Sequence, residues 1–339
     1  MLIVMTPQAG DDDIARVETA IRALDLSFHR IPGEYRTALA VIGNVAAVPK
    51  EHFESLAGVA EVITVSRPYR RVSRDTKSAD TVIDARGRII GGSRFVLIGG
   101  PCAVENEQQI MKTAQGVKEA GAHFLRGGAV KPRTSPYTFE GLGEKGYRLL
   151  HEAATACDLA TVSEVVDTET LAVAADYVDV VQVGSRNMQN FSLLKAVGHQ
   201  SKPVLLKRAA SATLEEFLLS AEHILSSGND QVILCERGIR TFSDFQRNTF
   251  DISVIPEIKT RSHLPIIADP SHASGKRSLI KPLSRAALAA GADGVMVEMH
   301  AKPQEALSDG CQSLYPEELV DLFEELRRLA PFFDKKVDV

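Results

Sequence analysis

The spacing of hydrophobic positions over the first 66 residues predicts a small domain of mixed helices and strands. Behind an acidic first turn, residues 11–24 place apolar side chains every three or four positions, which is typical of an amphipathic helix. A shorter helical segment surrounds residues 50–58. The order strand-helix-strand-strand-helix-strand is that of a ferredoxin-like α+β domain, which we expect over residues 1–66. The apolar runs with the length of strands are residues 2–5, 26–31, 36–43 and 61–66.

A basic, polar segment separates this pattern from the remainder of the chain. Residues 67–80, RPYRRVSRDTKSAD, show neither helical nor strand periodicity, and this composition predicts a linker. Residues 81–92 then have the pattern of a short hairpin. We therefore place the second domain at residues 81–339.

From residue 94 the pattern changes to short apolar runs that alternate with helix-like stretches. Eight such runs within about 240 residues predict an α/β fold with a closed parallel sheet, the (β/α)8 or TIM barrel. A doubly wound open sheet is the competing architecture, but the even spacing and the absence of a G-x-G-x-x-G turn favour the barrel. The runs are residues 94–100, 123–128, 159–165, 179–185, 203–208, 231–237, 265–271 and 294–299.

The composition excludes several classes of protein. Of the 339 residues 44% are hydrophobic, which is too many for a disordered chain, yet no apolar run approaches the ~20 residues of a membrane span. The net charge of -5 argues against a nucleic-acid partner. The start, MLIVMTPQAGDDD, has the pattern of a first strand and not of a signal peptide. The four cysteines form no C-x-x-C pair, so we expect reduced thiols and a cytoplasmic location.

Polar side chains follow each predicted barrel strand at its carboxyl end. In (β/α)8 barrels that end carries the active site, whereas the opposite end contributes to stability. One polar residue there would mean little, because strand ends border polar loops, but a contribution from every strand points to a functional site. These residues are Cys102, Arg126, Lys131, Glu164, Arg186, Lys207, Arg237, Asp269, His272, Glu298 and His300.

The lysines and arginines of this set, together with Arg133 of the loop after the second strand, predict an anionic ligand. Each cation alone can be an ordinary solvated loop charge. Like charges gathered at one mouth of an acidic protein need an anion, and arginine recognises carboxylate and phosphate with two parallel hydrogen bonds. Six cations suit more than one anionic group, such as a phosphate with a carboxylate and a second phosphate. They are Arg126, Lys131, Arg133, Arg186, Lys207 and Arg237.

The loop FLRGGAVKPRTSPY, residues 124–137, is the most specific segment. Its paired glycines allow close approach of the backbone to a ligand, and its two prolines stiffen the flanks. The residues between these prolines, Arg133, Thr134 and Ser135, suit the oxygens of a phosphate. The alternative is a surface turn in which the hydroxyls cap their own backbone. The cations at the strand end, Arg126 and Lys131, favour the phosphate site.

Four residues form a candidate metal site, because they follow the first, seventh and eighth strands, which become neighbours when a barrel closes. One sulfur, one nitrogen and two carboxylates suit a divalent transition metal such as Mn, Fe, Co or Zn, and suit Ca or Mg poorly. Alternatives exist for single members, since a cysteine can be a small buried apolar residue and an aspartate a turn residue. The four are Cys102, His272, Glu298 and Asp309.

These motifs resemble those of the 3-deoxy-arabino-heptulosonate 7-phosphate (DAHP) synthases. The ferredoxin-like extension resembles that of their type Iβ branch, so the resemblance covers the whole chain. The motifs that carry it are GPCAVE (100–105), LRGGAVKPRTSPY (125–137), GSRNMQNF (184–191), CERGIRTF (235–242), DPSHASGKR (269–277) and VEMHAKPQEALSDGCQSL (297–314).

The resemblance implies a transferase that condenses phosphoenolpyruvate with erythrose 4-phosphate and water to DAHP and phosphate, the first step of the shikimate pathway. It implies one divalent Mn, Co, Fe or Zn ion on the four residues named above, and catalytic roles for Lys131, Glu164 and His272. The erythrose 4-phosphate phosphate would meet Arg133, Thr134 and Ser135. Phosphoenolpyruvate would be held by Arg126, Lys131, Ser185, Arg186, Lys207 and Arg237.

Two departures from the family pattern are small. Ser185 and Ala209 stand where the family usually has alanine and glycine, so we expect altered backbone detail and retained activity. The related 3-deoxy-octulosonate 8-phosphate synthases are the alternative, with arabinose 5-phosphate as acceptor. They carry an asparagine-containing loop where this chain has KPRT, which favours erythrose 4-phosphate.

The resemblance also concerns the first domain. In this branch such an extension is associated with feedback inhibition by aromatic amino acids, so tyrosine or phenylalanine is the expected effector and a homo-oligomer, dimer or tetramer, the expected assembly. The extension can instead have a purely structural role. A non-catalytic amino-acid sensor on an inactive barrel is a further alternative, but retention of both the metal set and Lys131 argues against it.

Overall fold

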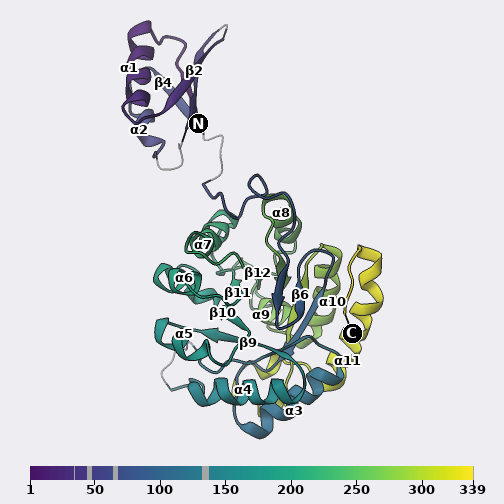
Figure 1. The fold of residues 1–339 in the computed structure, drawn as a ribbon. Helices are drawn as coiled ribbons and strands as arrows, with labels where there is room; N and C mark the ends of the chain where they lie inside the picture. The colour runs from purple at the N-terminus through teal and green to yellow at the C-terminus, as the bar shows by residue number, and fades with distance from the viewer. Residues whose placement is uncertain (34, 44–47, 64–67, 132–136, 339) are drawn as a thin grey trace. The chain divides into compact units, whose positions relative to one another are not determined.

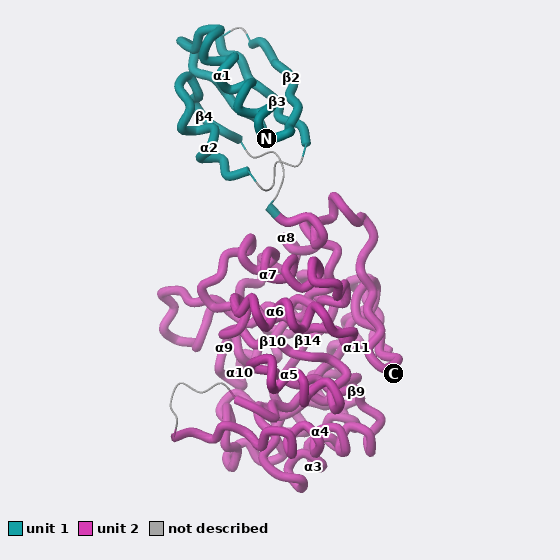
Figure 2. The backbone as a smooth tube through the Cα atoms, turned by 60° about the vertical axis from the view of Figure 1, so that its left-hand side comes forward, with its two compact units in different colours: residues 1–68 teal, residues 69–339 magenta. Residues whose placement is uncertain are grey.

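The computed structural model describes residues 1–33, 35–43, 48–63, 68–131 and 137–338. It divides the chain into two compact units, Met1–Pro68 and Tyr69–Val339, which Figure 2 shows in different colours. Each unit has an apolar core of its own.

The first unit is a four-stranded antiparallel sheet with strand order β2-β3-β1-β4 and two helices. In α1 the residues Ile14, Val17 and Ile21 are buried, as the helical spacing predicts, and they pack with one face of the sheet. This element order and strand order are those of the predicted ferredoxin-like domain. The elements are β1 Leu2–Met5, α1 Asp11–Arg22, β2 Ser27–Pro32, β3 Thr37–Ile42, α2 Glu51–Glu54 and β4 Val59–Ile63.

The opposite face of this sheet is partly open within the unit and is mostly apolar, with the polar side chains of Ser27, His29 and Glu61 among its residues. Side chains alternate between the two faces of a strand, so the partners of the buried positions point to this second face. It carries the half-buried alanines of β3 and three isoleucines, Ile31, Ile42 and Ile63, which are 48%, 47% and 43% exposed. An open apolar face of this kind is unusual unless it serves as a contact surface.

Residues 69–80 belong to the second unit, although the sequence predicts a linker over 67–80. The side chains of Tyr69 and Val72 are buried in the core of that unit, and the backbone N–H of Val72 donates to Glu222 of α7 at 3.0 Å. Of the charges that suggested a solvated linker, Arg74 donates to the carbonyl of Lys259 at 2.9 Å, and Arg71 pairs with Asp230 at 3.1 Å.

A small hairpin precedes the barrel. Its strands β5 (Ile83–Ala85) and β6 (Arg88–Ile90) pair with each other and bury Ile83, Ala85 and Ile90. These three side chains pack in one cluster with residues that begin the barrel strands, such as Val96 and Phe124. The hairpin therefore fills the amino-terminal end of the barrel and leaves the other end for ligands.

Eight parallel strands close the barrel in the order β10-β11-β12-β13-β14-β7-β8-β9, and helices surround it (Figure 1). The predicted (β/α)8 architecture is confirmed. The strands are β7 Val96–Gly100, β8 Phe124–Arg126, β9 Ala160–Val165, β10 Val180–Val183, β11 Val204–Lys207, β12 Val232–Glu236, β13 Ile266–Ala268 and β14 Gly294–Glu298. The helices are α3 Glu107–Glu119, α4 Glu144–Ala156, α5 Thr168–Ala174, α6 Phe191–Gly198, α7 Leu214–Ser226, α8 Val254–Arg261, α9 Pro270–Ser274, α10 Arg277–Ala289 and α11 Pro316–Leu329.

The interior of the barrel is filled by alternate residues of the strands. Side chains along a strand point alternately into and out of the barrel. Every second residue of a strand therefore points inward. The inward residues form an apolar layer of Ile98, Phe124, Val162, Val180, Leu205, Cys235, Ile267 and Met296. The layer above this one, nearer the carboxyl ends, is polar.

Candidate active site at the carboxyl end of the barrel

The polar layer follows from the strand register. Two residues beyond seven of the eight apolar interior positions, the chain places a charged or polar side chain at the mouth of the barrel, and beyond the eighth, Ile98, it places Gly100. All of these side chains are at most 9% exposed, so water solvates them little and their charges must be balanced by one another or by a ligand. The residues are Arg126, Glu164, Gln182, Lys207, Arg237, Asp269 and Glu298.

The four predicted metal ligands lie together. One ligand atom from each of Cys102, His272, Glu298 and Asp309 can be chosen so that all lie within 4.8 Å of one another. Cys102 Sγ is 3.3 Å from Asp309 Oδ2, and His272 Nε2 is 3.2 Å from Glu298 Oε1. Cys102 follows β7, and Glu298 ends β14, which pairs with β7. We call these four residues the metal group.

The protonation of the metal group suits a cation. Burial raises the pKa of the Cys102 thiol to about 11, so a metal ion must displace a proton there. Burial lowers the pKa of His272, which keeps its imidazole neutral and able to bind metal. Burial also acts to raise the pKa of Glu298, but His272 and Arg126 outweigh it, so the pKa is lowered. The group thus offers a neutral nitrogen, carboxylates and a thiol.

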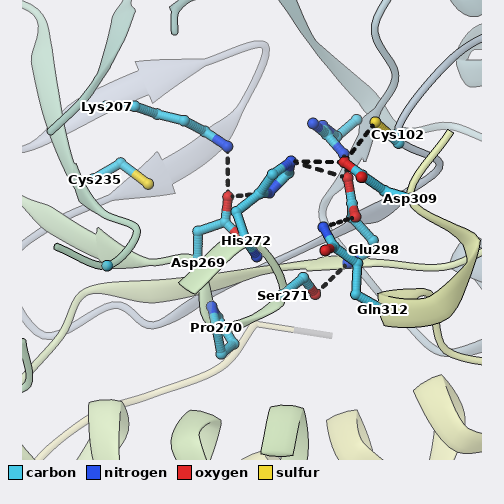
Figure 3. A network of polar contacts seen from close by, with 12 residues as sticks. Cys102, Lys207, Cys235, Asp269, Pro270, Ser271, His272, Glu298, Asp309 and Gln312 are labelled. Carbon is cyan, nitrogen blue, oxygen red and sulfur yellow. Dashed lines mark hydrogen bonds and ion pairs between the residues drawn. The ribbon is translucent and has the colours of Figure 1, made fainter. Parts of the chain in front are cut away.

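Neighbouring side chains fix the orientation of Glu298. Arg126 donates to Oε1 at 2.6 Å, and Gln312 donates to Oε2 at 2.6 Å. The backbone N–H of Glu298 donates to the Ser271 hydroxyl at 2.9 Å. Figure 3 shows Gln312 and Ser271 on the side of Glu298 away from Cys102. Partners of this kind hold a ligand in place and tune its affinity for metal.

Another carboxylate, Asp269, lies between the metal group and the cations. Its Oδ2 accepts from Lys207 Nζ at 2.5 Å and lies 2.7 Å from His272 Nδ1 (Figure 3). Its Oδ1 accepts the backbone N–H of His272 at 3.0 Å, which caps the short helix α9. Burial acts to raise the pKa of Asp269, but His272 and Lys207 outweigh it and hold the pKa well below its usual value.

A pocket of 760 Å³ opens above the polar layer. We call it the mouth pocket. Among its cations, Arg126 and Lys207 are paired with carboxylates, whereas Arg237, 8% exposed, forms no hydrogen bond or ion pair with another described residue. Burial lowers the pKa of Arg237, as expected for a guanidinium that lacks a close counter-charge. The basic residues lining the mouth pocket are Arg126, Lys131, Arg186, Lys207, Arg237, Arg240 and Arg247.

Two glycines position the other predicted catalytic residues. Lys131 Nζ donates to the carbonyl of Cys102 at 3.0 Å, and a Cβ on Gly128 would lie 2.9 Å from the Lys131 side chain. The Glu164 carboxylate rests against Gly184, where a Cβ would lie 1.8 Å from Oε1. The chain therefore leaves room for these side chains to turn toward the mouth pocket.

The structure brings most of the predicted site residues together at one place. Ser185 and Arg186 line the mouth pocket beside Glu164 and Lys131. Arg133, Thr134 and Ser135 lie outside the described residues. Several neighbours were not predicted as ligands or substrate contacts. Asp269 was named among the polar residues at the strand ends, but without a role, and counting by two along β10 would have found Gln182. These neighbours are Gln182, Asp269, Arg240, Arg247 and Gln312.

Comparison with known proteins agrees with this geometry. Residues 76–331 match the DAHP synthetase I family, and residues 1–67 match the DAHP synthase ferredoxin-like domain. The chain belongs to the DAHP synthetase I family. It is 48% identical, over 100% of both chains, to a phospho-2-dehydro-3-deoxyheptonate aldolase of Thermotoga maritima. The ferredoxin-like fold predicted for the first domain is thereby confirmed.

Solved structures agree as well. A crystal structure of the Thermotoga maritima DAHP synthase matches with a TM-score of 0.93 at 48% identity, over 99% of each chain. A truncated form of that enzyme covers 79% of this chain and 98% of its own length, with a TM-score of 0.74 and 49% identity.

More distant relatives belong to the predicted alternative. A 2-dehydro-3-deoxyphosphooctonate aldolase of Syntrophobacter fumaroxidans is 32% identical over 258 residues, which are 71% of this chain and 88% of that protein. The DAHP synthase of Thermotoga maritima has a higher sequence identity to this chain, and its similarity extends over the first domain as well.

Family membership confirms the activity predicted from the motifs. The protein is a transferase of the DAHP synthase type, which joins phosphoenolpyruvate and erythrose 4-phosphate at the first step of the shikimate pathway. Members of this family depend on a metal ion, and the metal group provides a set of ligands for one. The alternative of a non-catalytic sensor finds no support in these similarities. None of the described helices combines the length and apolar character needed to cross a bilayer.

Proposed function

We propose that the mouth pocket is the site where the two substrates meet. The observation that carries this proposal is a set of buried cations, drawn from separate strands of an acidic protein, around a pocket next to the metal group. Phosphoenolpyruvate has a phosphate and a carboxylate, which suit guanidinium groups that are held in place before the ligand arrives. Its proposed contacts are Arg126, Lys131, Ser185, Arg186, Lys207 and Arg237. The phosphate of erythrose 4-phosphate is assigned to Arg133, Thr134 and Ser135.

The metal group is proposed to hold one divalent transition metal ion, Mn, Co, Fe or Zn. A thiol, an imidazole and two carboxylates within 4.8 Å of one another fit such an ion by the chemistry of their atoms. When bound, the ion would supply Lewis-acid polarisation of the aldehyde of erythrose 4-phosphate. His272 contributes to catalysis as one of its ligands.

The protein's own residues orient the substrates and move protons. The enol carbon C3 of phosphoenolpyruvate attacks the aldehyde carbon, and the aldehyde oxygen receives a proton from Lys131 Nζ, which the Cys102 carbonyl holds beside the metal group. Water adds to C2 and gives its proton to the Glu164 carboxylate. The C2 hydroxyl then gives its proton to the neutral Lys131 amine as C2=O forms and the C–O bond to phosphate breaks, and the protonated Glu164 returns its proton to the departing phosphate. Both side chains line the mouth pocket, as these steps require.

This proposal is tested by phosphate release from phosphoenolpyruvate. The full-length protein should release phosphate only when erythrose 4-phosphate is also present. A chelator should stop the reaction, and Arg237→Met should weaken phosphoenolpyruvate binding because it removes the buried cation that has no counter-charge. If phosphate is released without erythrose 4-phosphate and at an unchanged rate in Arg237→Met, the reaction takes place outside the mouth pocket.

The first domain is proposed to bind tyrosine or phenylalanine and to contribute to a homo-oligomer, dimer or tetramer. The support is its open sheet face, where Ile31, Ile42 and Ile63 are each more than 40% exposed. An apolar sheet face suits contact with a second copy of the chain. An effector bound at such a contact can shift activity only if it prefers one arrangement of the domains.

A cytoplasmic location is proposed on the chemistry of the cysteines. All four are free in the structure, and the metal group needs Cys102 in its reduced form. A reducing compartment keeps it in that form.

A further inference from the structure

Asp269 is a buried carboxylate that contacts two sites at once. It is 0% exposed and is not among the residues that line the mouth pocket. One oxygen, Oδ2, lies 2.5 Å from Lys207 Nζ and 2.7 Å from His272 Nδ1. The other oxygen accepts the backbone N–H of His272. Since the carboxylate is held at both oxygens, its position is fixed relative to the imidazole.

The contact with His272 determines which ring nitrogen faces the metal group. A carboxylate is only an acceptor, so the shorter contact with Asp269 favours the hydrogen on Nδ1, which leaves Nε2 with a lone pair for a metal ion between it and Glu298. That Nε2 points toward Glu298 Oε1, at 3.2 Å, and Asp309 Oδ2, at 3.8 Å. The opposite tautomer would place a hydrogen where a metal ion should sit.

The contact with Lys207 balances a buried charge. Lys207 is 4% exposed, and Asp269 is its only ion-pair partner among the described residues. Lys207 lines the mouth pocket, where an anionic substrate would supply further negative charge. Without such an anion, an unpaired ammonium at this depth would be costly.

We propose that Asp269 is a positioning residue for the metal ion, which holds His272 in the Nδ1–H tautomer while balancing the charge of Lys207 until substrate binds. The proposal rests on the metal and substrate sites proposed above. The two contacts predict effects of opposite kind when the carboxylate is replaced by an amide of the same shape. Metal binding should weaken, because His272 then presents the wrong ring nitrogen. Phosphoenolpyruvate binding should not weaken, because the carboxylate that neutralised Lys207 is gone.

The test uses Asp269→Asn in the full-length, metal-free protein. The amide NH2 faces two donors, so the imidazole is expected to adopt the Nε2–H tautomer. Nitrogen-15 NMR of labelled histidine should show Nδ1–H for His272 in the parent and Nε2–H in the variant, with His272→Ala used to assign the signal. An unchanged tautomer would overturn the proposal.

Two binding measurements complete the test. Zinc affinity, measured by competition with a chelating dye, should fall about 10- to 100-fold in Asp269→Asn. Phosphoenolpyruvate binding to the metal-free variant, measured by calorimetry, should be equal or tighter. Lys207→Met should give the reverse pattern, with weaker phosphoenolpyruvate binding and undiminished zinc affinity. Loss of both affinities in Asp269→Asn would indicate a loosened fold and refute the positioning role.

Glu236→Gln is the matched control. Glu236 is a carboxylate of the adjacent strand β12, also 0% exposed, and it pairs with Arg208 and not with Lys207 or His272. The zinc affinity of Glu236→Gln should stay within about threefold of that of the parent. Thermal unfolding should show that each variant is folded. Cys102→Ser distinguishes failure of the proposed metal site from failure of the proposed role of Asp269. If that variant binds zinc like the parent, the metal site itself is wrong; if it loses zinc while Asp269→Asn does not, only the role of Asp269 fails.

Discussion

Replacing Gly184 by alanine should displace the Glu164 carboxylate without disturbing the backbone. Gly184 has φ -70° and ψ 160°, a conformation that alanine adopts freely, so no strain arises in the chain itself. The new Cβ would lie 1.8 Å from Glu164 Oε1, and ordinary contact begins at 3.4 Å. The carboxyl oxygen must therefore retreat by about 1.6 Å, which its flexible side chain permits.

This displacement should cost turnover and little stability. A misplacement of about 1 Å in a catalytic group can lower the rate about 100-fold, equivalent to about 2.7 kcal/mol of transition-state stabilisation. We expect kcat for phosphate release to fall by about that factor in Gly184→Ala. The midpoint of thermal unfolding should change little, because alanine reduces the freedom of the unfolded chain and only one side-chain end must move.

Two further variants make the result interpretable. Gly10→Ala is the matched control, because Gly10 also precedes a helix, has φ -82° and has no atom within 4 Å of the place that a Cβ would occupy. It should leave kcat unchanged. Glu164→Gln should itself lower kcat, and adding Gly184→Ala to it should cost nothing more if both act through the same carboxylate. Unchanged kcat in Gly184→Ala would refute Glu164 as the group that receives a proton from water.

Further predictions concern the metal, the substrates and the first domain. Chelation should abolish activity and Mn, Co or Zn should restore it, while Cys102→Ser should retain the fold and lose metal affinity; full activity of the serine variant would exclude the assigned ligand. Lys131→Ala should lower kcat by orders of magnitude with little change in the unfolding midpoint, and an unaltered kcat would reduce it to a bystander. Erythrose 4-phosphate should exceed arabinose 5-phosphate in kcat/KM, and the opposite ranking would favour the octulosonate-type reaction. Deletion of residues 1–68 should leave an active barrel that ignores tyrosine and phenylalanine; persistent inhibition would move the effector site to the barrel.

The polar layer of the site was predictable from the sequence because strand periodicity determines it. Once Phe124 is an interior residue of a strand, Arg126 must point inward two positions later, and the same holds from Met296 to Glu298. The same count of two residues from Ile267 places Asp269 in the polar layer. Its contacts with both His272 and Lys207, however, depend on side-chain positions that periodicity does not specify.

Other features depend on partners far away in the chain. The basic segment 67–80 looks solvated, but Arg74 donates to the carbonyl of Lys259, 185 residues later. Arg240 and Arg247 lie in a loop without periodicity, so no pattern assigns them to the mouth pocket. Such pairings appear only when the barrel has closed and brought its helices and loops together.

The closure of the barrel also has a consequence for the order of events in biosynthesis. The metal group spans the seam between β7 and β14, the first and last strands of the barrel to be made, and Cys102 and Asp309 are 207 residues apart. A ribosome must release nearly the entire barrel before these atoms can meet, so an incomplete chain has no complete binding site to capture an ion. Metal binding is therefore expected to follow closure of the barrel. It should also stabilise the closed barrel, because an ion that binds only this state adds its binding free energy to the free energy needed to separate β7 from β14.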